Sequence, residues 1–233
     1  MGRRGEIPAI KDSLLQARNL KNLRFQNISG GICTQADWPE CQGFFKFGYG
    51  EVFPALEELD LSYDDYQFPL DLSPESCQGW ANSMDWSRLR RLNLDRIYEP
   101  YHLFEALAGK VPSLQALKFD LRSIDSLLRF SNSIDGLEEI VVADYCVDVF
   151  DEVREAFFSK HGHSLKKLHI NYIPWRRGFS AREMSKLVEI APGIRNLKLD
   201  VISEYDNYMD WVSTTCFSQS QLRLELTETF PPA

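Results

Sequence analysis

A short apolar pattern recurs along this chain and limits what it can fold into. Its clearest copy spans residues 89–97, where Leu92 and Leu94 alternate with Arg91 and Asn93. Successive side chains of a β-strand point to opposite faces of the sheet. This segment therefore predicts a short strand that turns its leucines inward and its polar side chains outward.

The pattern, which places apolar residues at its first, fourth and sixth positions, occurs seven times. Successive copies start 36, 33, 25, 23, 28 and 29 residues apart. Most of the intervening stretches contain one helix-like segment that ends at Pro or Gly. This alternation is typical of a solenoid, in which each strand-plus-helix unit packs against its neighbours. The copies begin at Leu20, Leu56, Leu89, Leu114, Leu137, Leu165 and Ile194.

Three copies share a further feature, because Pro54, Pro112 and Pro192 each stand two residues before the first apolar position. These copies resemble leucine-rich repeats, which begin Leu-x-x-Leu-x-Leu-x-x-Asn/Cys, and their Pro resembles the irregular repeats of fungal F-box proteins. The resemblance implies a leucine-rich-repeat solenoid of the α/β class, with parallel strands on the concave face and helices on the convex face. The ninth position departs from the family pattern and is occupied by Ile28, Asp64, Ile97, Arg122, Tyr145, Ile173 and Ile202.

We expect residues 1–233 to form a single domain of about seven irregular repeats, because a solenoid grows by adding units. Residues 29–52 and 62–86 are long for connections, and we interpret them as insertions. The first mixes glycines with aromatic residues, so it is either a binding loop or a packed insertion. The second is acidic and predicts a short helix from Glu75 to Met84. The helix expected over residues 6–18 has an apolar side and does not resemble the polar cap that ends a solenoid. We therefore expect that an N-terminal portion is missing. We find no F-box pattern in the sequence.

Other stretches between the strands also predict helices. Residues 101–111 have apolar side chains at helical spacing, and Asp148 and Gly162 are suited to begin and end a further helix. A capping-box sequence at Ser180 begins another, whose buried face we expect to include Leu187, Val188 and Ala191. A last apolar alternation predicts a closing strand at Leu222, Leu224 and Leu226.

The composition limits the kinds of partner and the cellular compartment that we expect for this chain. A net charge of −8 argues against general binding to nucleic acid or an anionic membrane. No signal peptide or long apolar run is visible in the sequence, and its odd number of cysteines is widely spread, so we expect a reduced, intracellular protein in the cytoplasm or nucleus. We also expect a monomer. The cysteines are Cys33, Cys41, Cys77, Cys146 and Cys216.

Motifs typical of catalysis are missing from the sequence. Clustered imidazoles occur only at His161, His163 and His169, and there is no His-Glu-x-x-His, paired-Cys spacing or Gly-x-Ser-x-Gly. We therefore expect no catalysis, no cofactor and no metal. The alternative is an α/β hydrolase or metal-dependent enzyme on a doubly wound sheet. Such a sheet has a switch point, whereas a solenoid places each strand beside its neighbours in sequence.

The outward strand positions predict where a partner would bind. These positions mix both signs of charge and contain few aromatic residues, which favours recognition of a protein by complementary charge. We expect an acidic segment of the partner to cross a basic diagonal on this face. A Trp-Arg pair in the loop after the sixth strand would provide an anchor. The candidate partner-binding residues are Arg91, Asn93, Lys118, Lys167, His169, Lys198, Trp175 and Arg176.

The sequence thus predicts a noncatalytic protein–protein interaction module. The resemblance implies a more specific role, the substrate-recognition part of an F-box-type ubiquitin-ligase adaptor. No residue pattern indicates which protein is bound.

Overall fold

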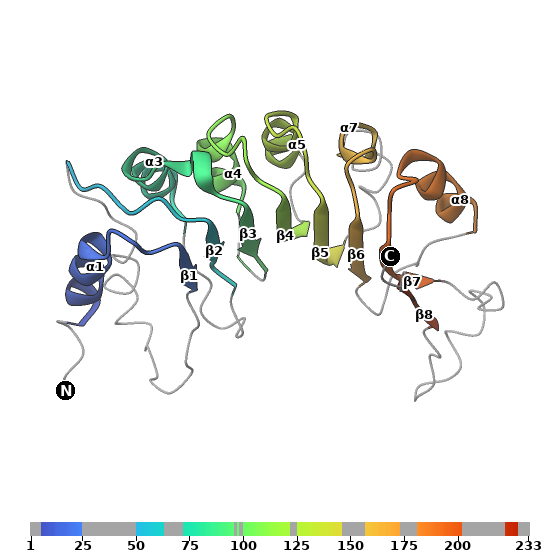
Figure 1. Cartoon of the computed structure of the whole chain (residues 1–233), viewed down its shortest axis with the longest axis horizontal. Helices are drawn as coiled ribbons and strands as arrows, with labels where there is room; N and C mark the ends of the chain where they lie inside the picture. Colours follow the sequence, from blue (N-terminus) through green and yellow to red (C-terminus); the bar gives the residue numbers. More distant parts are fainter. Residues whose placement is uncertain are drawn as a thin grey trace, which may run out of the picture.

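The computed structural model describes residues 6–24, 50–62, 72–95, 97, 100–121, 125–145, 157–172, 181–201 and 222–227. These residues form an α/β structure with one open sheet of eight strands (Figure 1). The strands are β1 (Asn22–Arg24), β2 (Glu58–Asp60), β3 (Arg91–Leu94), β4 (Ala116–Leu121), β5 (Glu139–Tyr145), β6 (Lys167–Tyr172), β7 (Asn196–Val201) and β8 (Leu222–Thr227). The helices are α1 (Glu6–Gln16), α3 (Pro74–Ser83), the 3₁₀ turn η2 (Trp86–Arg88), α4 (Tyr101–Leu107), α5 (Asp125–Asn132), α7 (Ser159–His161) and α8 (Ala181–Ile190).

The strands pair in sequence order, and β1 to β7 are parallel. The predicted parallel sheet is therefore confirmed. The described strands have no switch point in their order, so the doubly wound alternative is wrong as a description of this sheet. The closing strand is confirmed as β8, which runs antiparallel to β7. The central apolar positions lie in one continuous register: Leu23, Leu59, Leu92, Leu117, Ile140, Leu168 and Leu197.

A repeated hydrogen-bond pattern joins the parallel strands where they begin. The carbonyl oxygen of Lys21 accepts from the backbone N–H groups of both Glu57 and Glu58, at 2.7 and 3.0 Å. One residue before a strand, a single carbonyl thus binds two consecutive N–H groups of the next unit. Because this geometry recurs at every parallel junction, units of unequal length are joined in the same way. The other accepting carbonyls belong to Glu57, Arg90, Gln115, Glu138 and Lys166.

The helices from α3 to α8 lie on the outer, convex side of the curved row of strands (Figure 1). Successive helices α3, α4 and α5 pack against one another. Apolar side chains of the strands and helices form one continuous core, in which the first residue of the pattern is fully buried at Leu56, Leu89, Leu137 and Leu165. Each unit therefore buries its apolar side chains against its neighbours.

Several helix ends follow from local chemistry. The side chain of Ser73 accepts from the backbone N–H of Ser76, and Pro74 occupies the first turn, so α3 begins there. The predicted helix from Glu75 to Met84 is thus confirmed to within a residue. Gly109, with φ 79°, follows α4 in the left-handed region that glycine favours at helix ends.

The predicted buried face of α8 is wrong at Val188. Leu187 and Ala191 are buried as expected, but Val188 is 59% exposed. The apolar side chains that reach the core are Leu187, Ile190 and Ala191. Those three share one side of the helix, whereas Val188 lies about 100° around the axis from Leu187.

Several predictions fall on residues outside the described ranges. They include residues 29–49 and 63–71 of the two insertions, the N-cap at Asp148, and the Trp175–Arg176 pair. Four of the five cysteines also lie there. The thiol of Cys77 is buried and donates to the carbonyl oxygen of Leu72, with 3.6 Å between sulfur and oxygen. None of the helices in the described ranges has the length and apolar character needed to cross a bilayer.

Candidate functional site

The face of the sheet opposite the helices, called here the open face, displays the outward side chains that the sequence predicts. Two rows of side chains cross β1 to β7 in unbroken register. Adjacent strands lie about 4.8 Å apart, so each row is a continuous line. The first row is Asn22, Glu58, Arg91, Ala116, Glu139, Lys167 and Asn196; the second is Arg24, Asp60, Asn93, Lys118, Val141, His169 and Lys198.

A chain of ion pairs holds the first row together. Arg91 Nε lies 3.5 Å from Glu58 Oε1, and its Nη1 lies 3.5 Å from Glu139 Oε2. Glu139 also binds Lys167, whose Nζ lies 2.5 Å from Oε1. The chain of pairs extends from β2 to β6, and Glu139 joins its two halves.

Ala116 explains how Arg91 reaches a carboxylate two strands away. β4 lies between β3 and β5, and Ala116 is the first-row residue of β4. It is only 9% exposed. A longer side chain at this position would stand between the Arg91 guanidinium and Glu139, so the small residue permits the pair across the strand.

The second row also contains paired groups. Arg24 Nε lies 3.1 Å from Asp60 Oδ2, and Lys118 Nζ lies 2.5 Å from Asp95 Oδ2. His169 Nε2 lies 2.9 Å from Asn196 Oδ1. Of these contacts, only the Arg24–Asp60 pair lies within this row, because Asp95 follows β3 outside both rows and Asn196 belongs to the first row.

Two second-row residues also shape the strand ends. Asp60 Oδ1 accepts from the backbone N–H of Ser62 at 2.9 Å, and Asn93 Oδ1 accepts from that of Asp95 at 3.1 Å. These Asx-type contacts, in which a side chain binds a backbone group two residues on, stabilise turns. Asn93 therefore has a structural contact in addition to its predicted role in partner binding.

The structure brings six of the eight candidate residues to one face. They are Arg91, Asn93, Lys118, Lys167, His169 and Lys198. Their predicted basic diagonal is instead a mosaic of both charges, because three of the cations contact carboxylates. Sequence reasoning did not pair these groups. The signal was present, since opposite charges at equivalent positions of adjacent strands attract each other.

The clustered histidines are not brought together. His161 is fully buried, and its Nε2 lies 3.0 Å from Ser131 Oγ and 3.3 Å from the Ser131 carbonyl. Burial lowers the pKa of His161 to about 4. His163 is exposed, and His169 lies on the open face. Within the described ranges, no group of three or more His, Cys, Asp or Glu side chains could hold a metal ion.

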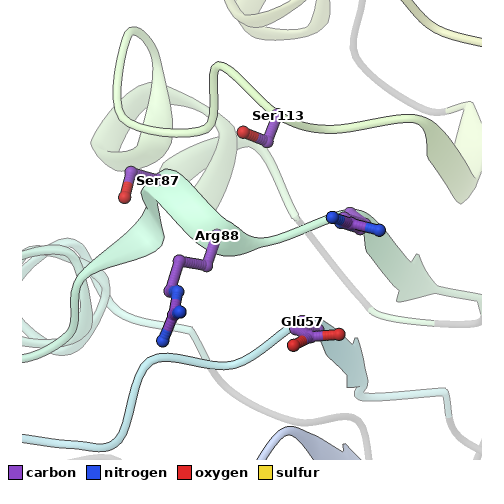
Figure 2. A pocket seen from close by; sticks show the side chains of 5 residues that line it. Glu57, Ser87, Arg88 and Ser113 are labelled. Carbon is purple, nitrogen blue, oxygen red and sulfur yellow. The ribbon is translucent and has the colours of Figure 1, made fainter.

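A second surface feature lies at the edge where the strands begin. It is an open pocket of about 200 Å³ lined by Glu57, Ser87, Arg88, Arg90 and Ser113 (Figure 2). Lys21 Nζ lies 2.9 Å from Glu57 Oε1, and this contact holds the pKa of the Glu57 carboxyl below its usual value. Asp85, at the start of η2, similarly accepts from Ser87, which lowers the pKa of Asp85.

Fold and surface together define an α/β protein with one open, mostly parallel sheet and a charged face opposite its helices. No protein-family model, curated protein or solved structure matches the chain. The open face and the adjoining pocket are therefore the features from which a function can be argued.

Proposed function

We propose that this chain is a leucine-rich-repeat solenoid that acts as a noncatalytic protein-interaction module and binds its partner across the open face. The observation that supports this most directly is the pair of side-chain rows in register over seven parallel strands. The described helices from α3 to α8 lie on the opposite side, so they leave this face to a partner (Figure 1).

The dimensions of the face suit a protein. Six strand spacings of about 4.8 Å give the rows a length of roughly 29 Å, which is comparable to one side of a standard protein interface. Apart from Ala116, Val141 and His169, the rows contain charged and amide groups instead of the apolar lining that is typical of small-molecule sites. Partner recognition would depend on matching the alternating charges.

The ion pairs also favour binding with little rearrangement. Lys167 is held by Glu139, and Lys118 is held by Asp95. Side chains already fixed in the free protein lose less conformational freedom when a partner binds. The mosaic can therefore distinguish partners by the placement of their charges, since a misplaced like charge is repelled.

The finer form of this proposal is a substrate-recognition part of an F-box-type ubiquitin-ligase adaptor. It depends on the resemblance at Pro54, Pro112 and Pro192, and the geometry of the open face adds no support for it. If it is correct, a captured partner should be ubiquitinated less in cells that lack this protein. Unchanged ubiquitination would leave only the general interaction role.

Site-specific photocrosslinking tests the general proposal. A benzoylphenylalanine at Val141 would stand in the middle of the open face without removing an ion pair, because Val141 is half-buried and apolar. The matched control has the same crosslinker at Gln78, which is exposed on α3. We expect one or a few proteins to crosslink from position 141 and not from position 78. Equal labelling from both positions, or none from position 141, would contradict binding at the open face.

A further inference from the structure

The pocket where the strands begin is built on a rigid turn. Trp86 of η2 is buried, and its Nε1 donates to the carbonyl of Trp80 at 3.1 Å. Asp85 Oδ1 accepts from the backbone N–H of Ser87 at 3.0 Å and fixes the start of the turn. The residues that follow are therefore displayed from a well-supported backbone.

The turn leads into an alternation of buried and outward residues. Leu89 and Leu92 are buried in the core, whereas Arg88 and Arg90 line the pocket. Arg91 is the next residue and belongs to the first row of the open face. Three arginines thus form one corner, which we call the arginine corner, between the edge pocket and the face.

Arg88 and Arg90 differ from the cations of the open face. Within the part of the chain that the structure describes, neither guanidinium has an ion pair or a hydrogen bond. Lys21 and Lys166 occupy positions equivalent to Arg90 in other units, and both bind carboxylates there, at 2.9 and 2.8 Å. Arg88 and Arg90 are both exposed.

The nearby carboxylates already have partners. Glu57 binds Lys21, and Asp85 binds Ser87. Both carboxyl groups have lowered pKa values and remain charged. Arg88 and Arg90 also contribute to the lowered pKa of Glu57, and Arg88 to that of Asp85, by attraction at longer range than an ion pair, so the carboxylates reduce the positive potential of the pocket without direct contact with the guanidinium groups. Figure 2 shows the Arg88 side chain extending from the end of η2 toward the segment before β2, where Glu57 lies.

The arginine corner is suited to a carboxylate ligand. A guanidinium has planar N–H donors that match the two oxygens of a carboxylate. The hydroxyl of Ser113 borders the same pocket and provides a further donor. Arg91 lies 3.5 Å from each of its carboxylates, beyond the roughly 2.7–2.9 Å of a strong charge-assisted bond. It therefore retains capacity to bind a further carboxylate.

We propose that the arginine corner binds an acidic segment of the partner protein. One Asp or Glu side chain of that segment would enter the pocket between Arg88 and Arg90, and the segment would continue past Arg91 onto the open face. This inference rests on the proposed function and names the partner chemistry. It places the main acid-binding site at two unpaired arginines instead of the paired cations of the predicted diagonal.

Fluorescence anisotropy with a fluorescein-labelled peptide of alternating Glu and Gly tests the inference. The test variant combines Arg88→Glu with Arg90→Glu, and the control combines Arg129→Glu with Lys186→Glu, two cations of the helices α5 and α8. Both change the net charge equally. We expect the test variant to bind about tenfold more weakly than the parent, and the control to lose less than about threefold. If the charge-reversed protein unfolds, the milder pair Arg88→Gln with Arg90→Gln replaces it as the test variant. This pair should also weaken binding.

Three outcomes of the peptide measurement would overturn the inference. They are absence of binding by the parent, equal weakening by the test and control variants, and binding only of a matched phosphoserine peptide, which would identify a phosphate site. The crosslink from position 141 separates this inference from the proposed function. If the arginine variant still crosslinks fully, only the acidic-segment inference fails; if the parent does not crosslink, the proposed function fails.

Discussion

The two faces of this sheet use the same strands in different ways. On the helix side, the central residues from Leu59 to Leu197 are between 0% and 6% exposed, whereas on the open face the Arg91 side chain is 59% exposed. Burial of apolar area on the helix side stabilises the fold, since burying one such side chain contributes about 1.5–3 kcal/mol. Exposed ion pairs contribute only about 0–1 kcal/mol. Substitutions on the two faces should therefore have effects that differ severalfold.

The largest effect is expected from a cavity on the helix side. Leu117→Ala removes a side chain that is 1% exposed in the middle of the sheet and should lower the free energy of unfolding by about 2–5 kcal/mol. The matched control is Val188→Ala on exposed helix surface, which should change stability by less than about 0.5 kcal/mol. Urea denaturation measures both. Similar losses in the two variants would contradict the assignment of stability to the buried face.

A second large effect concerns His161, which is buried in the helix layer. The pKa of His161 is lowered to about 4 by burial, while an unfolded His titrates near 6.5. Between these values the unfolded chain binds a proton that the folded chain does not. The contribution of neutral His161 to the free energy of unfolding is fully present above pH 6.5. It decreases as the pH falls, and up to about 3 kcal/mol is lost near pH 4.

Urea midpoints measured at pH 7 and pH 5 test this dependence. His161→Gln should be less stable than the parent at pH 7, because the contact with Ser131 changes, but should lose less stability on acidification. Lys160, His163 and Asp135 also act on His161 electrostatically. An equal loss in the parent and the variant would assign the acid sensitivity to those or other groups.

A third effect depends on backbone contact between neighbouring units. A Cβ at Gly162 would lie 2.3 Å from the Ile190 carbonyl oxygen and 2.6 Å from that of Phe158. Gly162→Ala should therefore destabilise the protein by about 1–3 kcal/mol through overpacking. Gly79→Ala is the control, because a Cβ there meets nothing within 4 Å and Ala favours the helix. If both changes are neutral or stabilising, the close approach to Ile190 is not a constraint.

Much of the helix side could be predicted from the sequence. The period of two places Leu92 and Leu94 inward, and the regular order of the copies predicts parallel strands in sequence order. Gly162 was predicted to end a helix, which it does at the C-cap of α7. The steric reason for a glycine could not be predicted, because it depends on the Ile190 carbonyl of the next unit.

The open face was less predictable because its contacts depend on several strands at once. The Arg91–Glu139 pair requires the correct register of three strands and a small residue at Ala116 between them. The sequence placed Arg91 outward but did not reveal its partner. Arg88 and Arg90 were missed because both precede β3: Arg88 ends η2, and Arg90 stands one residue before the outward strand positions that predict partner binding.

The smallest effect should come from reversing charges on the open face. Lys118→Glu with Lys167→Glu removes the pairs with Asp95 and Glu139 and places like charges beside both carboxylates. We expect a loss of about 1 kcal/mol, because both pairs are only partly buried and keep contact with solvent, and because like charges on neighbouring strands repel modestly. Salt should reduce this loss by screening the repulsion. Thermal melts of the parent and the variant at low and high ionic strength measure it. A salt-independent loss as large as that of Leu117→Ala would mean that the ion pairs of the open face hold the sheet together, and the contrast between the two faces would then fail.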